Sequence, residues 1–182
     1  METLETRAAD FEQADAVFCA LGTTRAAVAN AAEYRRIDVD YVEKAAAAAR
    51  AAGVPHFALV SSQGANKDTW YSELKAFHGF FYMHVKGLAE AAVSKRAFPR
   101  TSIYRPGMLD RGGHASRGVT EAVACKVLPS TSVADLARAM IFVAERDAVV
   151  ARAASASKPF TIYETPDIRA LAKQARMPPP AV

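Results

Sequence analysis

The stretch AVFCALG, residues 16–22, consists of six apolar residues followed by a glycine. An apolar run of this length without alternation is typical of a strand buried on both faces, as in a parallel sheet. Residues 56–60 (HFALV) have the same character and end at serines, and residues 102–105 begin a third strand that Pro106 and Gly107 stop. We expect a last strand at residues 160–163. These four runs predict the strands of one sheet.

Longer stretches with helical character separate the apolar runs. In residues 37–52 the apolar side chains Val39, Val42, Ala46 and Ala49 recur at helical spacing, and Gly53 follows as a C-cap. Further helices are predicted at residues 80–97, 119–127, 134–145 and 166–176, with Ser130 or Ser132 as the cap of the helix at 134–145. Strands that alternate with helices predict a single α/β domain over residues 1–182, built on a mostly parallel sheet with flanking helices.

Composition excludes several classes of function. The 182 residues carry 23 basic and 19 acidic side chains, a net charge of +4, with no run of Lys or Arg longer than two, so we expect no nucleic-acid partner. No apolar stretch approaches the ~20 residues of a membrane span. Cys19 and Cys125 lack the spacing of metal ligands, so no metal site is expected. The polar start of the chain carries no signal sequence, and a cytoplasmic location is expected.

The strongest chemical signal is the pair Tyr82 and Lys86. Residues four apart share one face of a helix, so the phenol and the ammonium can converge, and the cation stabilises a phenolate. Tyr82 is therefore a candidate general acid for reducing a carbonyl, and Lys86 a candidate ligand of ribose hydroxyls. Tyr71 and Lys75 have the same spacing but lie in an irregular segment. We favour Tyr82 because it opens a long predicted helix after a strand that ends in serines.

An ordered set of motifs resembles a known family. The motifs are FCALGTTR at residues 18–25, VDYV at 39–42, HF at 56–57, SSQGA at 61–65, YMHVKG at 82–87 and RPG at 105–107. Together they resemble the Tat-interacting-protein-like oxidoreductases, a group of atypical short-chain dehydrogenase/reductases. The resemblance runs from about Asp15 to Lys173. It implies a Rossmann-like fold that binds NADP(H), with NAD as the other possible cofactor.

The resemblance also assigns roles to single residues. It implies that Tyr82 donates a proton, that Lys86 binds the ribose, and that Ser61 or Ser62 holds the carbonyl of a small-molecule substrate, with Ser62 preferred. The residues implied to line the cofactor are Leu21, Gly22, Lys86, Leu109 and Arg117. Apart from the resemblance, Arg25 is a candidate contact of the 2′-phosphate of NADP. Arg25 is equally well explained as a local cap. Arg111 and Arg117 share one loop beyond a strand's carboxyl end, which suits a ligand site. No ligand role is expected for His56, His78 or His84.

Two departures from the family pattern change the expectations. Residues 71–79 look inserted, and we expect them to reshape the substrate pocket or to act as a lid. No glycine-rich phosphate-binding motif occurs in the sequence, so we expect a Rossmann-like domain that is truncated at its N-terminus. The strand at residues 16–21 is then an apolar sheet edge that a protein partner or a second copy covers. If the truncation abolishes cofactor binding, the alternative to a reductase is a non-catalytic nucleotide-sensing or protein-interaction regulator.

Overall fold

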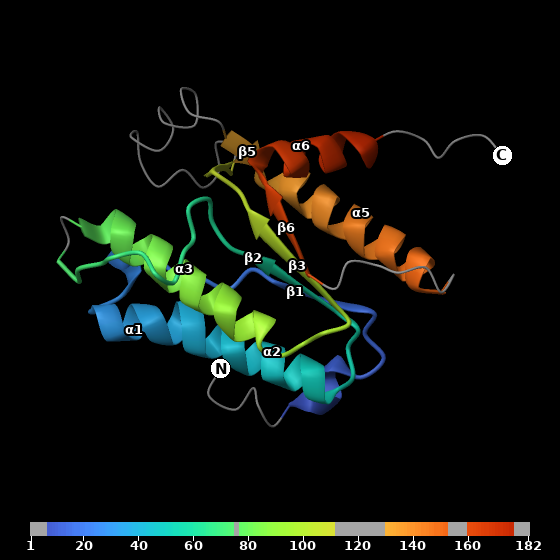
Figure 1. Ribbon diagram of the computed structural model, residues 1–182, viewed down its shortest axis with the longest axis horizontal. Helices are drawn as coiled ribbons and strands as arrows, with labels where there is room; N and C mark the ends of the chain where they lie inside the picture. The colour runs from blue at the N-terminus through green and yellow to red at the C-terminus, as the bar shows by residue number, and fades with distance from the viewer. Residues whose placement is uncertain (1–6, 75–76, 112–129, 153–159, 177–182) are drawn as a thin grey trace.

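A four-stranded parallel sheet forms the centre of the molecule (Figure 1). The computed structural model describes residues 7–74, 77–111, 130–152 and 160–176. The strand order is β1-β2-β3-β6, with β1 at Ala16–Cys19, β2 at His56–Val60, β3 at Arg100–Arg105 and β6 at Phe160–Glu164. All four strands were predicted from the sequence, and the expected α/β class is confirmed.

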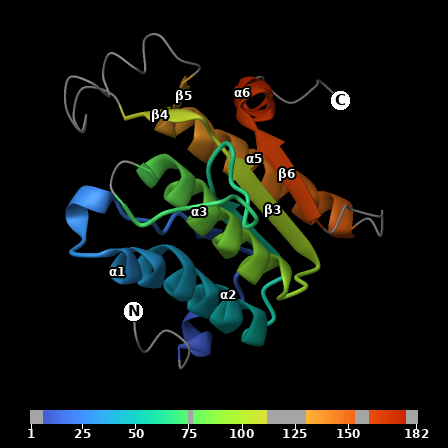
Figure 2. The ribbon, with the colours of Figure 1, turned by 60° about the vertical axis from the view of Figure 1, so that its left-hand side comes forward.

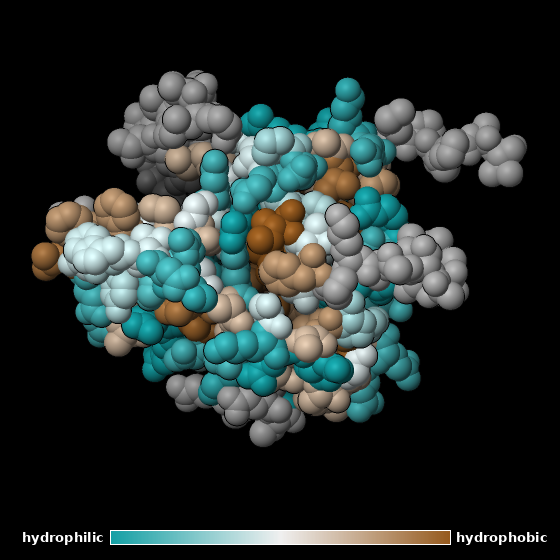
Figure 3. Space-filling view, in the orientation of Figure 1, coloured by the Kyte–Doolittle hydropathy of each residue, from teal (hydrophilic) through white to brown (hydrophobic). Residues whose placement is uncertain are grey.

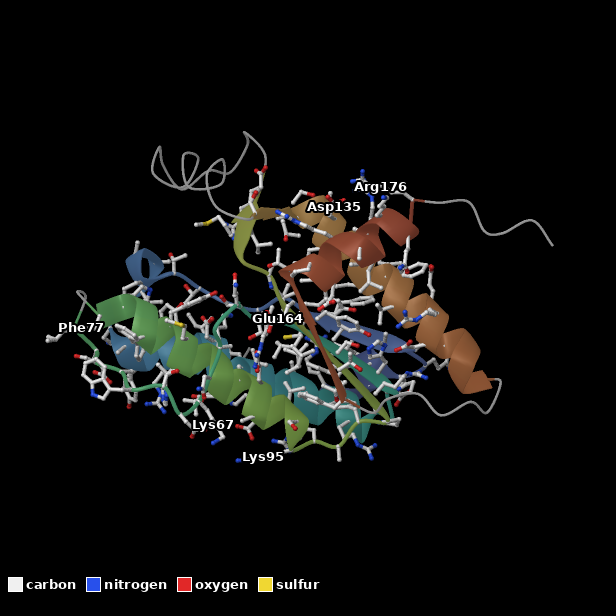
Figure 4. The ribbon with its side chains drawn as sticks, turned by 45° about the horizontal axis from the view of Figure 1, so that its top comes forward. Lys67, Phe77, Lys95, Asp135, Glu164 and Arg176 are labelled. Carbon is white, nitrogen blue, oxygen red and sulfur yellow. The ribbon has the colours of Figure 1, made fainter. Side chains whose placement is uncertain are left out.

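Helices cover both faces of this sheet (Figures 1 and 2). On one face lie α1 (Ala31–Arg35), α2 (Tyr41–Ala51) and α3 (His78–Ser94), and on the other lie α5 (Val133–Arg152) and α6 (Thr165–Gln174). The first face buries Phe57, Leu59 and Ile103 of the sheet. The second buries Ala58 and Tyr104 against α5 and α6. Arg176, just after the end of α6, is ion-paired with Asp135 in the first turn of α5 at 2.5 Å (Figure 4).

The helix predicted at residues 37–52 begins earlier and contains an irregular turn. Asn30 caps α1 by accepting a hydrogen bond from the backbone N–H of Glu33 at 2.8 Å. A π-helical turn at Arg36–Asp40 then joins α1 to α2. Such turns shift the register of a helix and are frequent at functional sites. Here the turn brings the carboxylate of Asp38 into the interior, where it is 0% exposed.

Two short strands beyond β3 were not predicted. Strand β4 (Met108–Asp110) pairs in parallel with β5 (Ser130–Ser132) in a separate small sheet. Strands of three residues are too short to show a hydrophobic period. Of the two residues considered as the cap of α5, Ser132 accepts a hydrogen bond with its hydroxyl from the N–H of Asp135 at 3.0 Å. The helix predicted at residues 119–127 lies outside the described residues, as does Arg117.

Strand β1 lies at one edge of the sheet. Within the described part of the chain it pairs with β2 alone, and Phe18 on this strand is 46% exposed. An apolar edge strand is a template for pairing with another chain. The edge position agrees with the sequence-based expectation, while the partner that covers it remains a prediction.

Gly87 marks the closest approach of α3 to the loop after β2. A Cβ atom at this position would lie 2.1 Å from the backbone N of Lys67 and 2.3 Å from the carbonyl carbon of Asn66. The same loop is bound to the helix by a hydrogen bond from the N–H of Asn66 to the carbonyl of Met83 at 3.0 Å. Because both clashes involve backbone, neither atom can turn away as a side chain would.

We therefore predict that Gly87→Ala lowers the free energy of unfolding by about 3 kcal/mol, measured by urea denaturation. In a helix without such a contact, replacing glycine by alanine stabilises by about 1 kcal/mol. Gly79→Ala is the matched control, because Gly79 also lies in α3 and a Cβ there would meet nothing within 4 Å. Equal effects of the two substitutions would show that α3 does not pack as described.

A buried histidine makes the fold sensitive to acid. His56 is 1% exposed, and its Nε2 lies 2.9 Å from Oγ of Ser102. Burial, and secondarily the charge of Arg100, lowers the pKa of His56 to about 4. The unfolded chain therefore takes up a proton near pH 6.5, and the folded chain does so only near pH 4. This difference stabilises the fold above pH 6.5.

We expect the His56 contribution to disappear as the pH falls from 6.5 to 4, at a total cost of about 3 kcal/mol. Urea denaturation at several pH values in this window measures the slope. His56→Gln keeps a hydrogen-bonding group but cannot titrate, so its stability should fall less steeply than that of the wild type. Parallel slopes for the two proteins would contradict the assignment.

Candidate functional site

A cavity of about 470 Å³ lies where β1 and β2 end. The carboxyl ends of parallel strands are the usual place for ligands in open α/β sheets. Its walls come from the loop after β1, the end of β2, helix α3 and the segment around β4: Ala20, Leu21, Gly22, Thr23, Thr24, Arg25, Tyr34, Val60, Ser61, His78, Tyr82, Lys86, Leu109 and Arg111. We call it the first cavity. Among the residues that line it are seven candidates from the sequence analysis: Leu21, Gly22, Arg25, Ser61, Tyr82, Lys86 and Leu109.

An ion pair lies beneath this cavity. Nζ of Lys86 is 2.8 Å from Oδ1 of Asp38, and the two side chains are 9% and 0% exposed. The other carboxylate oxygen of Asp38 accepts a hydrogen bond from the N–H of Thr23 at 2.7 Å. Asp38 thus fixes both the ammonium of Lys86 and the turn that follows β1.

Asp38 is the main site residue that the sequence analysis missed. A signal was present, because Asp38 precedes Val42 by four residues and so lies on the apolar stripe predicted to face the core. A carboxylate on such a stripe is buried, and a buried charge is stable only when it is paired, so the pattern indicates a buried cation nearby. The π-helical turn, which the sequence did not reveal, completes the approach of Asp38 to Lys86.

Gly22 leaves the ion pair open to the cavity. A Cβ atom on Gly22 would lie 3.1 Å from Nζ of Lys86 and 3.2 Å from Oδ1 of Asp38. Any side chain at this position would press on the pair and fill the space above it. The absence of a side chain at Gly22 therefore leaves a space, which we call the shelf, in which a flat or elongated ligand can approach Lys86 closely.

Tyr82 stands beside Lys86 on α3, as its spacing predicted. The tyrosine is half-buried, and Nζ of Lys86 lies 5.9 Å from the centroid of its ring. In the competing pair, Tyr71 stacks on the ring of His84 with centroids 4.1 Å apart, and Lys75 lies outside the described residues. The structure thus brings Tyr82, rather than Tyr71, together with the predicted cofactor-lining residues.

The two serines after β2 have different surroundings. Ser61 is buried, and its hydroxyl donates to Oε1 of Glu90 at 2.5 Å. Arg105 donates to both oxygens of the same carboxylate, at 2.9 and 2.6 Å. Ser62 is half-buried and lines a second cavity next to Tyr82. The structure therefore places Ser62, more than Ser61, where a ligand can reach its hydroxyl.

This second cavity has a volume of about 560 Å³ and adjoins the first. The two cavities share Tyr82, Leu109 and Arg111. The remaining residues that line the second cavity are Ser62, Gln63, Gly64, Met83, Gly107 and Met108. Tyr82 thus lies at the junction of two spaces, one beside Lys86 and one beside Ser62.

Basic side chains gather around the first cavity. Arg25 and Arg111 both line it, and His78 lies near Arg25. Partial burial, together with the charge of Arg25, lowers the pKa of His78. No ligand role was expected for His78; the structure places it in the wall of the first cavity, and whether it contacts a ligand stays a prediction. A cavity with this charge suits an anionic ligand.

The segment at residues 71–79 contributes little to either cavity in the described residues beyond His78. Instead, this segment and the residues on either side of it carry apolar surface. Leu74 and Phe77 within it are exposed, as are Trp70 before it and Phe80 after it, and the ring of Trp70 meets those of Phe77 and Phe80 edge to face. Figure 3 shows this apolar surface at the end of the molecule where α3 begins, and Figure 4 shows Phe77 pointing outward.

The residues that the structure describes show neither a membrane-spanning helix nor a cluster of metal ligands. None of their helices is both long and apolar enough to cross a membrane. Nor do three or more His, Cys, Asp or Glu side chains gather there as metal ligands would.

Comparison with known proteins identifies relatives. A family model described as NAD(P)H-binding matches residues 1–175. Protein HTATIP2 of Rattus norvegicus is 44% identical over 108 residues, which are 59% of this chain and 40% of that protein. Protein FMP52-1, mitochondrial, of Scheffersomyces stipitis is 39% identical over 125 residues, 69% of this chain and 50% of that protein. The chain thus spans about half the length of these relatives, and the predicted resemblance is confirmed.

Solved structures with low sequence identity share the fold. MoeE5 in complex with UDP-glucuronic acid and NAD has a TM-score of 0.61 at 15% identity, over 87% of this chain and 58% of that one. A UDP-galactose 4-epimerase has a TM-score of 0.58 at 16% identity, over 82% and 55%. A dTDP-4-dehydrorhamnose reductase from Yersinia enterocolitica has a TM-score of 0.60 at 16% identity, over 80% and 57%. These matches support the Rossmann-type architecture.

Proposed function

The chain belongs to the NAD(P)H-binding family, and on this premise we propose that it reduces a carbonyl group with NADP(H) as the cofactor and Tyr82 as the proton donor. The observation that carries the proposal is the position of Tyr82 between the two cavities. A proton donor for carbonyl reduction must reach the carbonyl oxygen, and the carbon of the same carbonyl must lie beside the cofactor that supplies the hydride, so a donor that borders both spaces suits the reaction. The first cavity is the proposed cofactor site and the second the proposed substrate site.

The residues around the first cavity fit the nicotinamide and ribose part of the cofactor. Leu21 and the shelf at Gly22 leave room above the buried ion pair, so that the ammonium of Lys86 can donate to ribose hydroxyls. Asp38 orients that ammonium. Leu109 also lines this cavity, and Arg117 keeps the proposed cofactor contact that the resemblance implies. The cofactor, when bound, supplies the hydride.

Charge favours the phosphorylated part of the cofactor at the same site. Arg25 and Arg111 line the first cavity and can neutralise a pyrophosphate in place of a glycine-rich loop. The preference for NADP(H) over NAD(H) is part of the proposal and rests on the resemblance. A partner chain or a second copy at the β1 edge is proposed to complete the site.

On the substrate side, Tyr82 and Ser62 are proposed to hold the carbonyl oxygen. The phenol donates its proton to that oxygen, and the hydroxyl of Ser62 donates a hydrogen bond to it. Ser61 has a different proposed role, because its hydroxyl is already bound to Glu90. Through this bond it ties the end of β2 to α3 and helps to position its neighbour.

The alternative is a non-catalytic regulator that senses nucleotides or binds proteins. One observation favours it: Lys86 and Ser61 are both held by internal carboxylates, those of Asp38 and Glu90. The ammonium and the hydroxyl that a reductase would direct to its ligands are thus already engaged inside the fold, as in a scaffold that binds no substrate. The cytoplasmic location inferred from the sequence stays a prediction, and names of yeast relatives carry the word mitochondrial.

Steady-state consumption of NADPH with a panel of aldehydes and ketones tests the proposal. The reductase predicts turnover that depends on Tyr82. A regulator predicts that the folded chain consumes no NADPH above background, whatever carbonyl is offered. The variants that distinguish a specific role of Tyr82 from a general loss of structure are considered in the Discussion.

A further inference from the structure

The walls of the second cavity indicate a class of substrate. We propose that this cavity takes an uncharged, apolar aldehyde or ketone whose hydrocarbon part lies against Met83, Met108 and Leu109. This inference rests on the proposed function, because it treats the second cavity as the place of the substrate. It goes further by naming the chemistry that the cavity selects.

Apolar groups make up most of the lining. Met83, Met108 and Leu109 supply side chains, and glycines at 64 and 107 supply bare backbone. Among the described residues that line this cavity, Arg111 is the only charged one, and it also faces the first cavity. With Ser62 and Tyr82 assigned to the carbonyl oxygen, Gln63 is the one further uncharged polar side chain in the described lining.

This lining disfavours a sugar. Each hydroxyl of a bound sugar must exchange its water for a protein partner, and a hydroxyl buried without one loses affinity. Beyond the carbonyl site the described lining offers Gln63, Arg111 and backbone groups, whereas Met83, Met108 and Leu109 give hydroxyls no hydrogen-bond partner over the apolar wall. The solved structures that share this fold include proteins whose names refer to sugar nucleotides, but their identity of 14–16% shows the fold alone. A volume of about 560 Å³ is ample for a medium-sized hydrocarbon chain.

Met83 is the residue that we expect to determine specificity. It follows Tyr82 in α3, and its Sδ packs over Gly64, where a Cβ atom would lie only 2.8 Å from the sulfur. Gly64 has a φ of +79°, which glycine adopts without strain. The thioether therefore lies flat on the loop after β2 and forms the wall next to the phenol. An unbranched, polarizable side chain of this kind adapts to linear chains.

Chain-length kinetics test the proposal in the full chain with NADPH. From butanal to octanal, kcat/KM should rise by about fourfold for each added CH₂. Butanal should be preferred over erythrose, a hydroxylated aldehyde with the same number of carbons. Met83→Gln should flatten the chain-length dependence chiefly through KM, and Met83→Leu should keep it. Equal or better reduction of erythrose, or an unchanged slope in Met83→Gln, would overturn the proposal.

A second measurement does not need turnover. Octanamide, an unreactive analogue, is titrated into the chain with isotopically labelled methionine methyl groups, and NMR follows each signal. The Met83 and Met108 signals, assigned with Met83→Leu and Met108→Leu, should move. That of Met140, which is buried between α5 and the sheet, should not.

Together the two measurements separate the two claims. Methyl shifts without turnover support an apolar cavity and contradict the reductase. Turnover without a chain-length preference supports the reductase and contradicts the apolar substrate. If neither methyl shifts nor turnover is observed, both the apolar substrate and the reductase are contradicted.

Discussion

Tyr82→Phe is expected to lower kcat/KM for carbonyl reduction at least about 100-fold, the lower end of what a general acid contributes. The substitution removes one hydroxyl from a half-buried ring at the junction of the two cavities and leaves the ring in place. NADPH binding should stay within about twofold, because the proposed ribose contact comes from Lys86. Initial rates of NADPH consumption and a binding titration measure the two quantities.

Tyr71→Phe is the matched control for this experiment. Tyr71 begins the second Tyr-x-x-x-Lys sequence, and its ring stacks on His84 away from the described cavity linings. We expect it to retain activity within about threefold of the wild type, as for a side chain outside the site. If Tyr71→Phe abolished activity and Tyr82→Phe did not, the proton donor would be wrongly assigned.

Asp38→Ala is expected to lower the free energy of unfolding by about 3–5 kcal/mol, because it leaves the buried ammonium of Lys86 without its counter-charge. The turn after β1 loses its anchor as well, since the N–H of Thr23 donates to the same carboxylate. Urea denaturation measures the loss. In the double variant with Lys86→Met the charge disappears, and the double variant should recover a large part of the stability.

An exposed ion pair provides the control for Asp38. Nη2 of Arg96 lies 2.8 Å from Oε1 of Glu43, but the side chains of Arg96 and Glu43 are 35% and 46% exposed. Water screens such a pair, so Glu43→Ala should cost less than about 1 kcal/mol. A cost for Asp38→Ala as small as that for Glu43→Ala would contradict a buried pair beneath the cavity.

Much of the fold followed from hydrophobic pattern. The four predicted runs became β1, β2, β3 and β6. The central strands β2 and β3 are buried along nearly their whole length, as uninterrupted apolar sequence indicates, whereas β1 and β6 lie at the edges of the described sheet and are partly exposed. The periodic stretches became α2, α3, α5 and α6. What the pattern could not reveal is short or irregular: the small sheet of β4 and β5, and the π-helical turn at Arg36–Asp40.

The site was predictable in part for the same reason. Residues that follow strands, such as Leu21 and Gly22, or that share one helix face, such as Tyr82 and Lys86, converge because the topology forces them to. The partnership of Asp38 with Lys86 joins residues 48 positions apart, and no local spacing encodes it. Likewise, only packing distinguishes Ser61, bound to Glu90, from its neighbour.

Titration of NADPH into the purified chain by calorimetry tests the central claim most directly. We expect saturable binding by the folded wild type. The affinity for NADPH should be at least about tenfold weaker in Gly22→Val, because the valine side chain would fill the space above Lys86 and Asp38. No binding by a folded chain, or equal binding by the two proteins, would contradict the assignment of the first cavity to the cofactor.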